Sequence, residues 1–111
     1  MSIKTLYKKE INRIRNRIVD KYGPEKIILF GSCANGRIRR DSDADMLIVK
    51  RSSQPGFRRS QAVYKLLSNL RYKIPLDVIV YTPSEFKERF KIGDAFIREI
   101  CEQGKTLYAK N

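Results

Sequence analysis

The stretch KIILFGSCANGRIRRDSDADMLIVK, residues 26–50, sets two short apolar runs on either side of a long polar segment. The first run, Ile27 to Phe30, leads directly into Gly31-Ser32, and the second follows the acidic pattern Asp43-Ala-Asp45. Continuous apolar runs of this length are typical of strands that are buried on both faces. We therefore expect two strands, over residues 26–30 and 45–50, with the polar residues between them.

The rest of the chain supplies further apolar runs and amphipathic segments. Leu76 to Tyr81 predicts a third strand, and Lys105 to Tyr108 a short final edge strand. Helical spacing of apolar residues, with Thr82-Pro83 as a start signal, predicts helices over residues 3–22, 57–72, from 83 towards Gly93, and 94–102. This order indicates an α/β or α+β fold, in which helices flank a small mixed sheet of three to four strands.

Length and charge limit the classes of protein to which this chain can belong. The 111 residues suffice for one hydrophobic core, so we expect a single domain over residues 1–111. Lys and Arg number 24 and Asp and Glu 12, and the resulting net charge of +12 favours a polyanionic partner. No apolar run is long enough to cross a bilayer, and Cys33 and Cys101 lack metal or disulfide spacing. A reduced, cytoplasmic protein without a membrane segment is expected.

The chain contains no histidine. Ser-His-Asp and Cys-His triads, zinc sites with histidine ligands and a histidine general base are therefore excluded. Acid–base or metal chemistry must depend on carboxylates.

Three carboxylates occupy positions suited to such chemistry. Asp43 and Asp45 lie two residues apart at a strand start, so their side chains should point to one face. Asp77 lies inside an apolar run, where a charge is costly unless it is paired or metal-bound. Hard oxygen ligands of this kind suit Mg²⁺ or Mn²⁺. The alternatives are a hydrophilic turn for the first two residues and an ion pair with Lys or Arg for Asp77.

The Gly31-Ser32 turn has the properties of a phosphate-binding element. A glycine lets the backbone approach a ligand closely, and the Ser32 hydroxyl and following amides could face phosphate oxygens from a short helix at residues 33–35. A strand followed by Gly-Ser is a weak signal by itself.

Taken together, these motifs resemble the minimal nucleotidyltransferases of the polymerase β-like superfamily, the small partners in HEPN–MNT toxin–antitoxin pairs. The resemblance covers residues 27–108. It is carried by Leu29-Phe-Gly-Ser32, Gly36, Ser42-Asp-Ala-Asp45 and the segment from Leu76 to Phe86.

The resemblance implies a polymerase β-like nucleotidyltransferase fold and specific roles. Asp43 and Asp45 would hold two Mg²⁺ ions, and Asp77 would share one of them and position or deprotonate the acceptor hydroxyl. Gly31 and Ser32 would contact the β- and γ-phosphates of the nucleotide. Asn35 stands where the family often has arginine, so Arg37, Arg39 or Arg40 could supply that charge, and Arg37 and Arg40 are our predicted nucleotide-binding arginines.

The implied activity is transfer of AMP from ATP to a hydroxyl, with a tyrosine of a cognate HEPN toxin as the acceptor and this chain as the antitoxin. Two alternatives stay open. One is an antitoxin that neutralises the toxin by binding alone, and the other is an RNA-binding or RNA-modifying protein, which the positive net charge favours. Self-association is also left open.

The basic residues of the first predicted helix have two interpretations. A solvated face is the ordinary one, and a binding face is the more specific one. The residues concerned are Lys4, Lys8, Arg13, Arg15 and Arg17.

Overall fold

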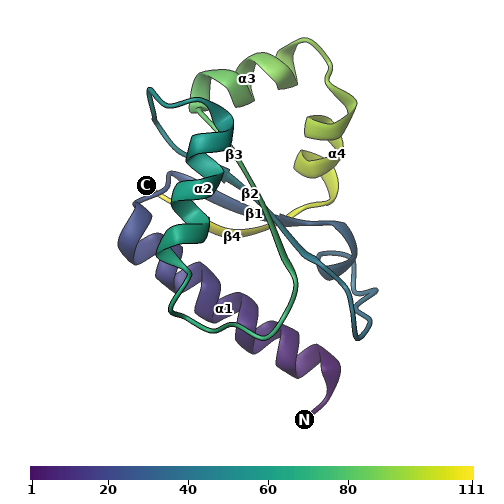
Figure 1. The fold of residues 1–111 in the computed structure, drawn as a ribbon. Coiled ribbons are helices and arrows are strands. Elements are labelled where there is room, and N and C mark those ends of the chain that lie inside the picture. The colour runs from purple at the N-terminus through teal and green to yellow at the C-terminus, as the bar shows by residue number, and fades with distance from the viewer.

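The apolar runs of the sequence form one four-stranded mixed sheet in the computed structural model, which describes residues 1–111 (Figure 1). The strand order is β3-β2-β1-β4. Strand β1 (Lys26–Phe30) pairs antiparallel with β2 (Ala44–Val49) and with β4 (Lys105–Ala109), whereas β2 pairs parallel with β3 (Leu76–Tyr81). The predicted strands are therefore confirmed, with the second shifted by one residue and β4 at an edge.

Helices cover both faces of the sheet. Helices α1 (Ile3–Tyr22) and α2 (Gly56–Leu66) pack on one face, and α3 (Pro83–Lys91) and α4 (Ala95–Gln103) lie on the other (Figure 1). A single 3₁₀ turn, Gly31–Cys33, follows β1. None of these helices combines the length and the apolar character needed to span a membrane.

The two-sided cover explains why β1 and β2 are apolar without alternation. Ile27 and Leu29 of β1 point into the larger core under α1 and α2, whereas Ile28 points into the smaller core under α4. Leu47 of β2 joins the smaller core, and its neighbour Ile48 joins the larger one.

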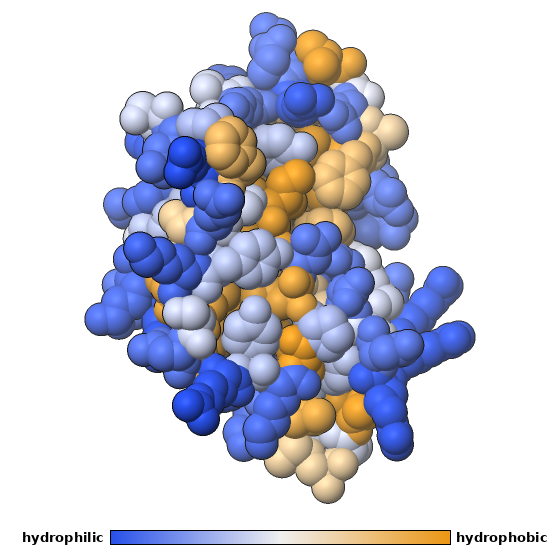
Figure 2. Space-filling view, viewed as in Figure 1, coloured by the Kyte–Doolittle hydropathy of each residue, from blue (hydrophilic) through white to orange (hydrophobic).

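In the view of Figure 2 hydrophilic residues dominate the rim of the molecular surface, and hydrophobic residues show in a band down the middle.

Local signals set most helix ends as the sequence predicts. Gly23 adopts a left-handed conformation with φ of 65° and ends α1. Thr82 and Glu85 form the expected capping box of α3, because each side chain accepts a hydrogen bond from the other residue's backbone N–H. Asp94 caps α4 by accepting from the N–H groups of the following turn.

Helix α2 is shorter than the helix predicted over residues 57–72. It ends at Leu66, and its last carbonyl accepts a hydrogen bond from Arg17 Nη1, whose other bond goes to Asn69 Oδ1. Arg13 similarly donates to the Leu70 carbonyl. Two cations of α1 therefore replace the missing helical hydrogen bonds, which apolar spacing could not reveal.

A buried arginine joins α2, β3 and α3. The Arg59 side chain is 7% exposed and forms two hydrogen bonds with the Glu85 carboxylate, of 2.7 and 3.0 Å. It also donates to the carbonyls of Val80 and Gln54. The hydrogen bonds from Arg59 hold the pKa of Glu85 below its ordinary value. This bidentate pair fixes the start of α3 to the larger half of the protein.

We expect Glu85→Gln to lower the free energy of unfolding by about 1 kcal/mol at pH 7, a modest value because the Glu85 side chain is 42% exposed. Glutamine keeps the helix cap but removes the charge facing Arg59. Because the pKa of Glu85 is lowered in the folded state, its contribution should disappear as pH falls through the ordinary glutamate pKa of about 4.3 and below. Urea unfolding across this range, with the exposed Glu88→Gln as the control, measures it; equal effects of the two variants at pH 7 would contradict it.

Candidate functional site

The predicted carboxylates meet where β1 ends and β2 and β3 begin. In the sheet register Asp45 of β2 is opposite Phe30 of β1 and opposite Asp77 of β3. Residues in register on adjacent strands point to the same face, so Asp45 and Asp77 share the face covered by α3 and α4. Asp43 immediately precedes β2 and lies two residues before Asp45.

The sheet register places Asp45 beside Asp77, and the charges of the three residues affect one another. The pKa of Asp45 is raised, first by its partial burial and then by the negative charges of Asp77 and Asp43. Asp43 and Asp77 are themselves exposed. Although Asp77 lies in an apolar run, β3 is an edge strand and the Asp77 carboxylate reaches solvent.

Gly31 makes room for Asp45. Its φ of 74° lies in the left-handed region, and a Cβ at this position would be 2.5 Å from Asp45 Oδ2. Any side chain at residue 31 would displace the carboxylate. We expected Gly31 to let a ligand approach the backbone closely. In this structure the group that approaches it closely is the Asp45 carboxylate.

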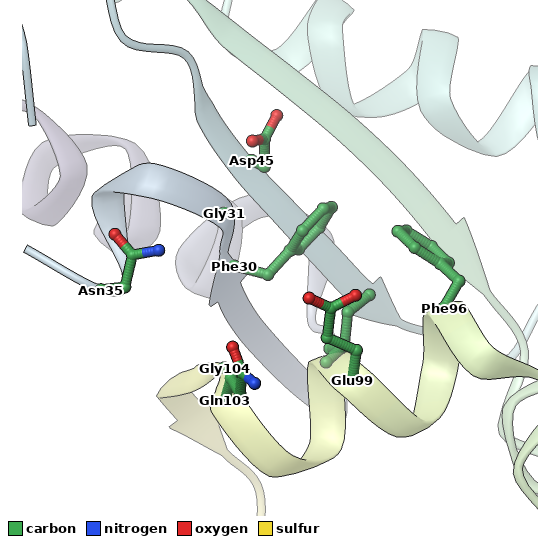
Figure 3. A pocket seen from close by; sticks show the side chains of 9 residues that line it. Phe30, Gly31, Asn35, Asp45, Phe96, Glu99, Gln103 and Gly104 are labelled. Atoms are coloured by element: carbon green, nitrogen blue, oxygen red, sulfur yellow. The ribbon is translucent and has the colours of Figure 1, made fainter. Parts of the chain in front are cut away.

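A cavity of about 220 Å³ opens beside Gly31 and Asp45 (Figure 3). Phe30 and Asn35 line it from the strand end and the following loop. Asp45 and Glu99 are its charged residues, and no Lys or Arg lines it. Each wall of the cavity therefore combines an acidic and an aromatic residue: Asp45 and Phe30 on the sheet, and Glu99 and Phe96 on α4.

Helix α4 forms the opposite wall of the cavity, which the sequence analysis did not assign to the site. Phe96 packs edge-on against Phe30, with ring centroids 5.5 Å apart, and Glu99 and Gln103 extend from the same helix face (Figure 3). Phe96 is 41% exposed. The recurrence of residues 96, 99 and 103 at helical spacing was the available signal, but it does not say which cavity they face.

Two buried groups fix the backbone next to Asp43. The Tyr7 hydroxyl of α1 donates to the Ser42 carbonyl at 2.8 Å and lies 3.1 Å from that of Arg40. Cys33 Sγ donates to the Asp43 carbonyl at 3.2 Å. The predicted packing role of Cys33 is confirmed by its burial, and it includes this contact.

A third group, Tyr64 of α2, fixes the backbone on both sides of Asp77. Its hydroxyl accepts a hydrogen bond from Val78 N at 2.8 Å and donates to the Leu76 carbonyl at 3.4 Å. Burial raises the pKa of Tyr64, and the nearby charge of Asp77 raises it further. Tyr64 thus occupies the free edge of β3, where another strand would otherwise pair.

The remaining predicted site residues lie around the cavity rather than in it. Ser32 is half-buried, and Arg37 and Arg40 are exposed on the loop before β2; none of the three lines the cavity. Arg37 and Arg40 form no ion pair. Their nucleotide-binding role stays a prediction.

The carboxylate oxygens of these aspartates suit a hard divalent cation that is also coordinated by oxygen atoms of a substrate. No three acidic or thiol side chains lie close enough together to form a preformed metal cage. Mg²⁺ is commonly held by one or two carboxylates, with substrate phosphates and water completing the octahedron. The clustered negative charge at Asp43, Asp45 and Asp77 is suited to that arrangement.

Comparison with known proteins finds a matching family and similar proteins whose names agree with it. The family model for the nucleotidyltransferase domain matches residues 11–105. The protein adenylyltransferase MJ0604 of Methanocaldococcus jannaschii is 35% identical over 104 residues, which cover 90% of this chain and 96% of that protein. The protein adenylyltransferase MJ0141 of the same organism is 33% identical over 98 residues, with 88% of each chain covered.

Solved structures share the fold at lower identity. The crystal structure of a toxin–antitoxin with AMP-PNP has a TM-score of 0.60 and 22% identity, covering 90% of this chain and 73% of that chain. A mutant of the toxin–antitoxin MntA-HpeT has a TM-score of 0.57 and 19% identity with the same coverage. The expected α/β architecture with a mixed sheet is confirmed.

We expect Asp45→Asn to raise the free energy of unfolding at pH 7 in metal-free buffer, because the amide removes the cost of burying a charge and then the repulsion with Asp77 and Asp43. Since the pKa of Asp45 is raised by folding, its charged form costs stability above that pKa. The gain should vanish below the ordinary aspartate pKa of about 3.9, where the carboxyl is protonated in both states. Urea unfolding at both pH values, with Asp20→Asn as the exposed control, measures this; a less stable Asp45→Asn at pH 7 would refute it.

Tyr64→Phe should lower the free energy of unfolding by about 1 kcal/mol and speed hydrogen exchange at the Val78 amide, which loses its acceptor. Tyr72→Phe is the matched control, because Tyr72 is also half-buried and its hydroxyl forms no hydrogen bond within the chain. Exchange that is unchanged at Val78 in Tyr64→Phe would show that the tyrosine does not hold this strand edge.

Proposed function

Because the chain belongs to the nucleotidyltransferase domain family and is a nucleotidyltransferase, we propose that it transfers AMP from ATP to a hydroxyl group of a partner protein. The protein acceptor is suggested by the two relatives named protein adenylyltransferases. One observation carries the proposal: Asp45 lies against Gly31 and in register with Asp77, and it lines a cavity of about 220 Å³.

The charge of the cavity supports a role for a divalent cation. Asp45 and Glu99 line it without a Lys or Arg, so a triphosphate entering alone would meet negative charge. Asp43, Asp45 and Asp77 are the residues that would hold Mg²⁺, or Mn²⁺. When bound, these ions would neutralise the phosphates and stabilise charge on the attacking and leaving oxygens.

The cavity walls indicate how the nucleotide would be oriented. Phe30 and Phe96 offer apolar surface to the base, and the side-chain amides of Asn35 and Gln103 can hydrogen-bond its polar edge. Glu99 can accept from ribose hydroxyls. This placement directs the phosphates towards Gly31 and Ser32, where Arg37 and Arg40 of the following loop could reach them from outside.

The reaction is an in-line displacement at the α-phosphorus. The acceptor oxygen forms a bond to phosphorus, the bond to the bridging oxygen of the β-phosphate breaks, and pyrophosphate leaves with that electron pair. Asp77 is our candidate for orienting the acceptor hydroxyl and accepting its proton, because it is exposed at the sheet edge and next to Asp45. The absence of histidine leaves carboxylates to perform this step.

We further propose that the acceptor is a tyrosine of a HEPN toxin and that the chain acts as its antitoxin. The resemblance of the motifs supports this partner, and the solved structures of similar fold are toxin–antitoxin proteins.

The test uses ATP labelled at the α-phosphate, Mg²⁺ and the product of the adjacent gene. We expect label on that protein and release of pyrophosphate, and a loss of about 10²-fold or more in Asp45→Asn. Asp20→Asn, an exposed aspartate of α1, should retain activity. Because Asp45→Asn should be at least as stable as the parent at pH 7, its lost activity would not reflect unfolding.

Other outcomes separate the alternatives. Neutralisation of the toxin by Asp45→Asn at full strength, without label transfer by the parent, would contradict the transferase role of the site and favour binding alone. Label on tRNA rather than on protein would contradict the protein acceptor and favour RNA modification.

A further inference from the structure

A second, larger hollow lies on the opposite face of the sheet from the nucleotide cavity. This groove has a volume of about 450 Å³ and runs between α1, the loop after the 3₁₀ turn and strand β4. Ile11, Leu29, Ile38 and Leu107 form an apolar floor. We call it the α1–β4 groove.

Unpaired cations surround the floor. Lys4, Lys8 and Arg15 line the groove from one face of α1, and Lys105 lines it from the start of β4. None of these four residues forms an ion pair, and no acidic residue lines the groove. The basic face of α1 is therefore divided: Arg17 binds the last carbonyl of α2, Arg13 binds a carbonyl after it, and the other three cations face the groove.

One wall of the groove is an open sheet edge. Strand β4 pairs only with β1, so the backbone groups on its other side have no strand partner. Thr106 and Leu107 of this strand line the groove. An edge of this kind accepts an extended segment, whose alternate side chains then point to opposite faces.

We propose that the α1–β4 groove binds an extended, acidic segment of a partner protein. Apolar side chains of that segment would cover the floor, and its carboxylates would pair with Lys4, Lys8, Arg15 and Lys105. Charge complementarity selects this occupant, because four cations without a counter-charge surround an apolar surface. The inference concerns binding alone and goes beyond the proposed transfer reaction.

Two other occupants fit less well. Single-stranded RNA would find cations but no aromatic side chain on which to stack its bases, since none lines the groove. A second copy of this chain carries a net charge of +12 and would be repelled.

The groove and the cavity of the candidate site are lined by neighbouring residues of one segment, the one that follows β1. Cys33, Gly36 and Ile38 line the groove, while Gly31 and Asn35 of the same loop line the nucleotide cavity. A segment bound in the groove would therefore lie next to the loop that borders the nucleotide.

The test uses the ¹⁵N-labelled full chain, without nucleotide, and a short peptide in which Val and Glu alternate, at about 0.15 M salt. Amide shifts should concentrate at Gly36, Ile38 and residues 105–107. Lys8→Glu combined with Lys105→Glu should weaken binding about tenfold. Lys87→Glu combined with Lys91→Glu changes the net charge equally on exposed α3 and should leave affinity within about twofold.

Each contrary result would overturn the inference. Absence of peptide binding, shifts outside the groove, or equal weakening by the two double variants would show that the groove is not the site. Tighter binding of an RNA of matched charge at the same amides would favour RNA. Sedimentation showing a dimer that Lys8→Glu with Lys105→Glu dissolves would favour a second copy. Urea unfolding of both variants establishes that they are folded, and Lys4→Gln with Lys8→Gln, which leaves β4 intact, should still weaken binding.

Discussion

The partial burial of Asp45 beside two further carboxylates is the constraint around which the site is arranged. Burial raises the pKa of Asp45 first, and repulsion by Asp77, in register, and by Asp43, two residues earlier, raises it further. A fold that only maximised stability would separate these groups. Keeping them together gives a concentrated negative charge that a divalent cation and a triphosphate could neutralise, which is the basis of the proposed transfer reaction.

The surrounding structure opposes that repulsion through the backbone. The Tyr7 hydroxyl donates to the carbonyl before Asp43, and the Cys33 thiol donates to the carbonyl of Asp43 itself. The Tyr64 hydroxyl binds backbone groups of the residues on both sides of Asp77. Gly31 leaves Asp45 the space that any side chain would occupy. These hydrogen bonds go to the backbone, and none of the three carboxylates pairs with a cation, so the carboxylate oxygens stay available to ligands. The site thus depends on α1 and α2, although both helices pack on the opposite face of the sheet.

The excess of Lys and Arg serves several separate purposes. Arg13, Arg17 and Arg59 complete internal hydrogen bonding, where a planar guanidinium can reach several carbonyl or carboxylate oxygens at once. Arg37 and Arg40 are exposed and form no ion pair on the loop that contributes Asn35 to the cavity beside Asp45. A third set borders the α1–β4 groove. The Lys and Arg residues behind the net charge of +12 therefore include internal contacts and two distinct surfaces rather than one face alone.

The sequence by itself determined the features that depend on neighbours along the chain. Continuous apolar runs predicted β1 and β3, Thr82 and Glu85 predicted the start of α3, and the spacing of Asp43 and Asp45 predicted a shared face. Only the tertiary structure decided which elements meet. It placed Asp77 on an exposed edge, ended α2 early with arginines from α1, and brought Phe96, Glu99 and Gln103 of α4 to the cavity. The reason is physical: periodicity and capping are local, whereas strand register and helix packing join residues far apart in the chain and leave no fixed spacing to read.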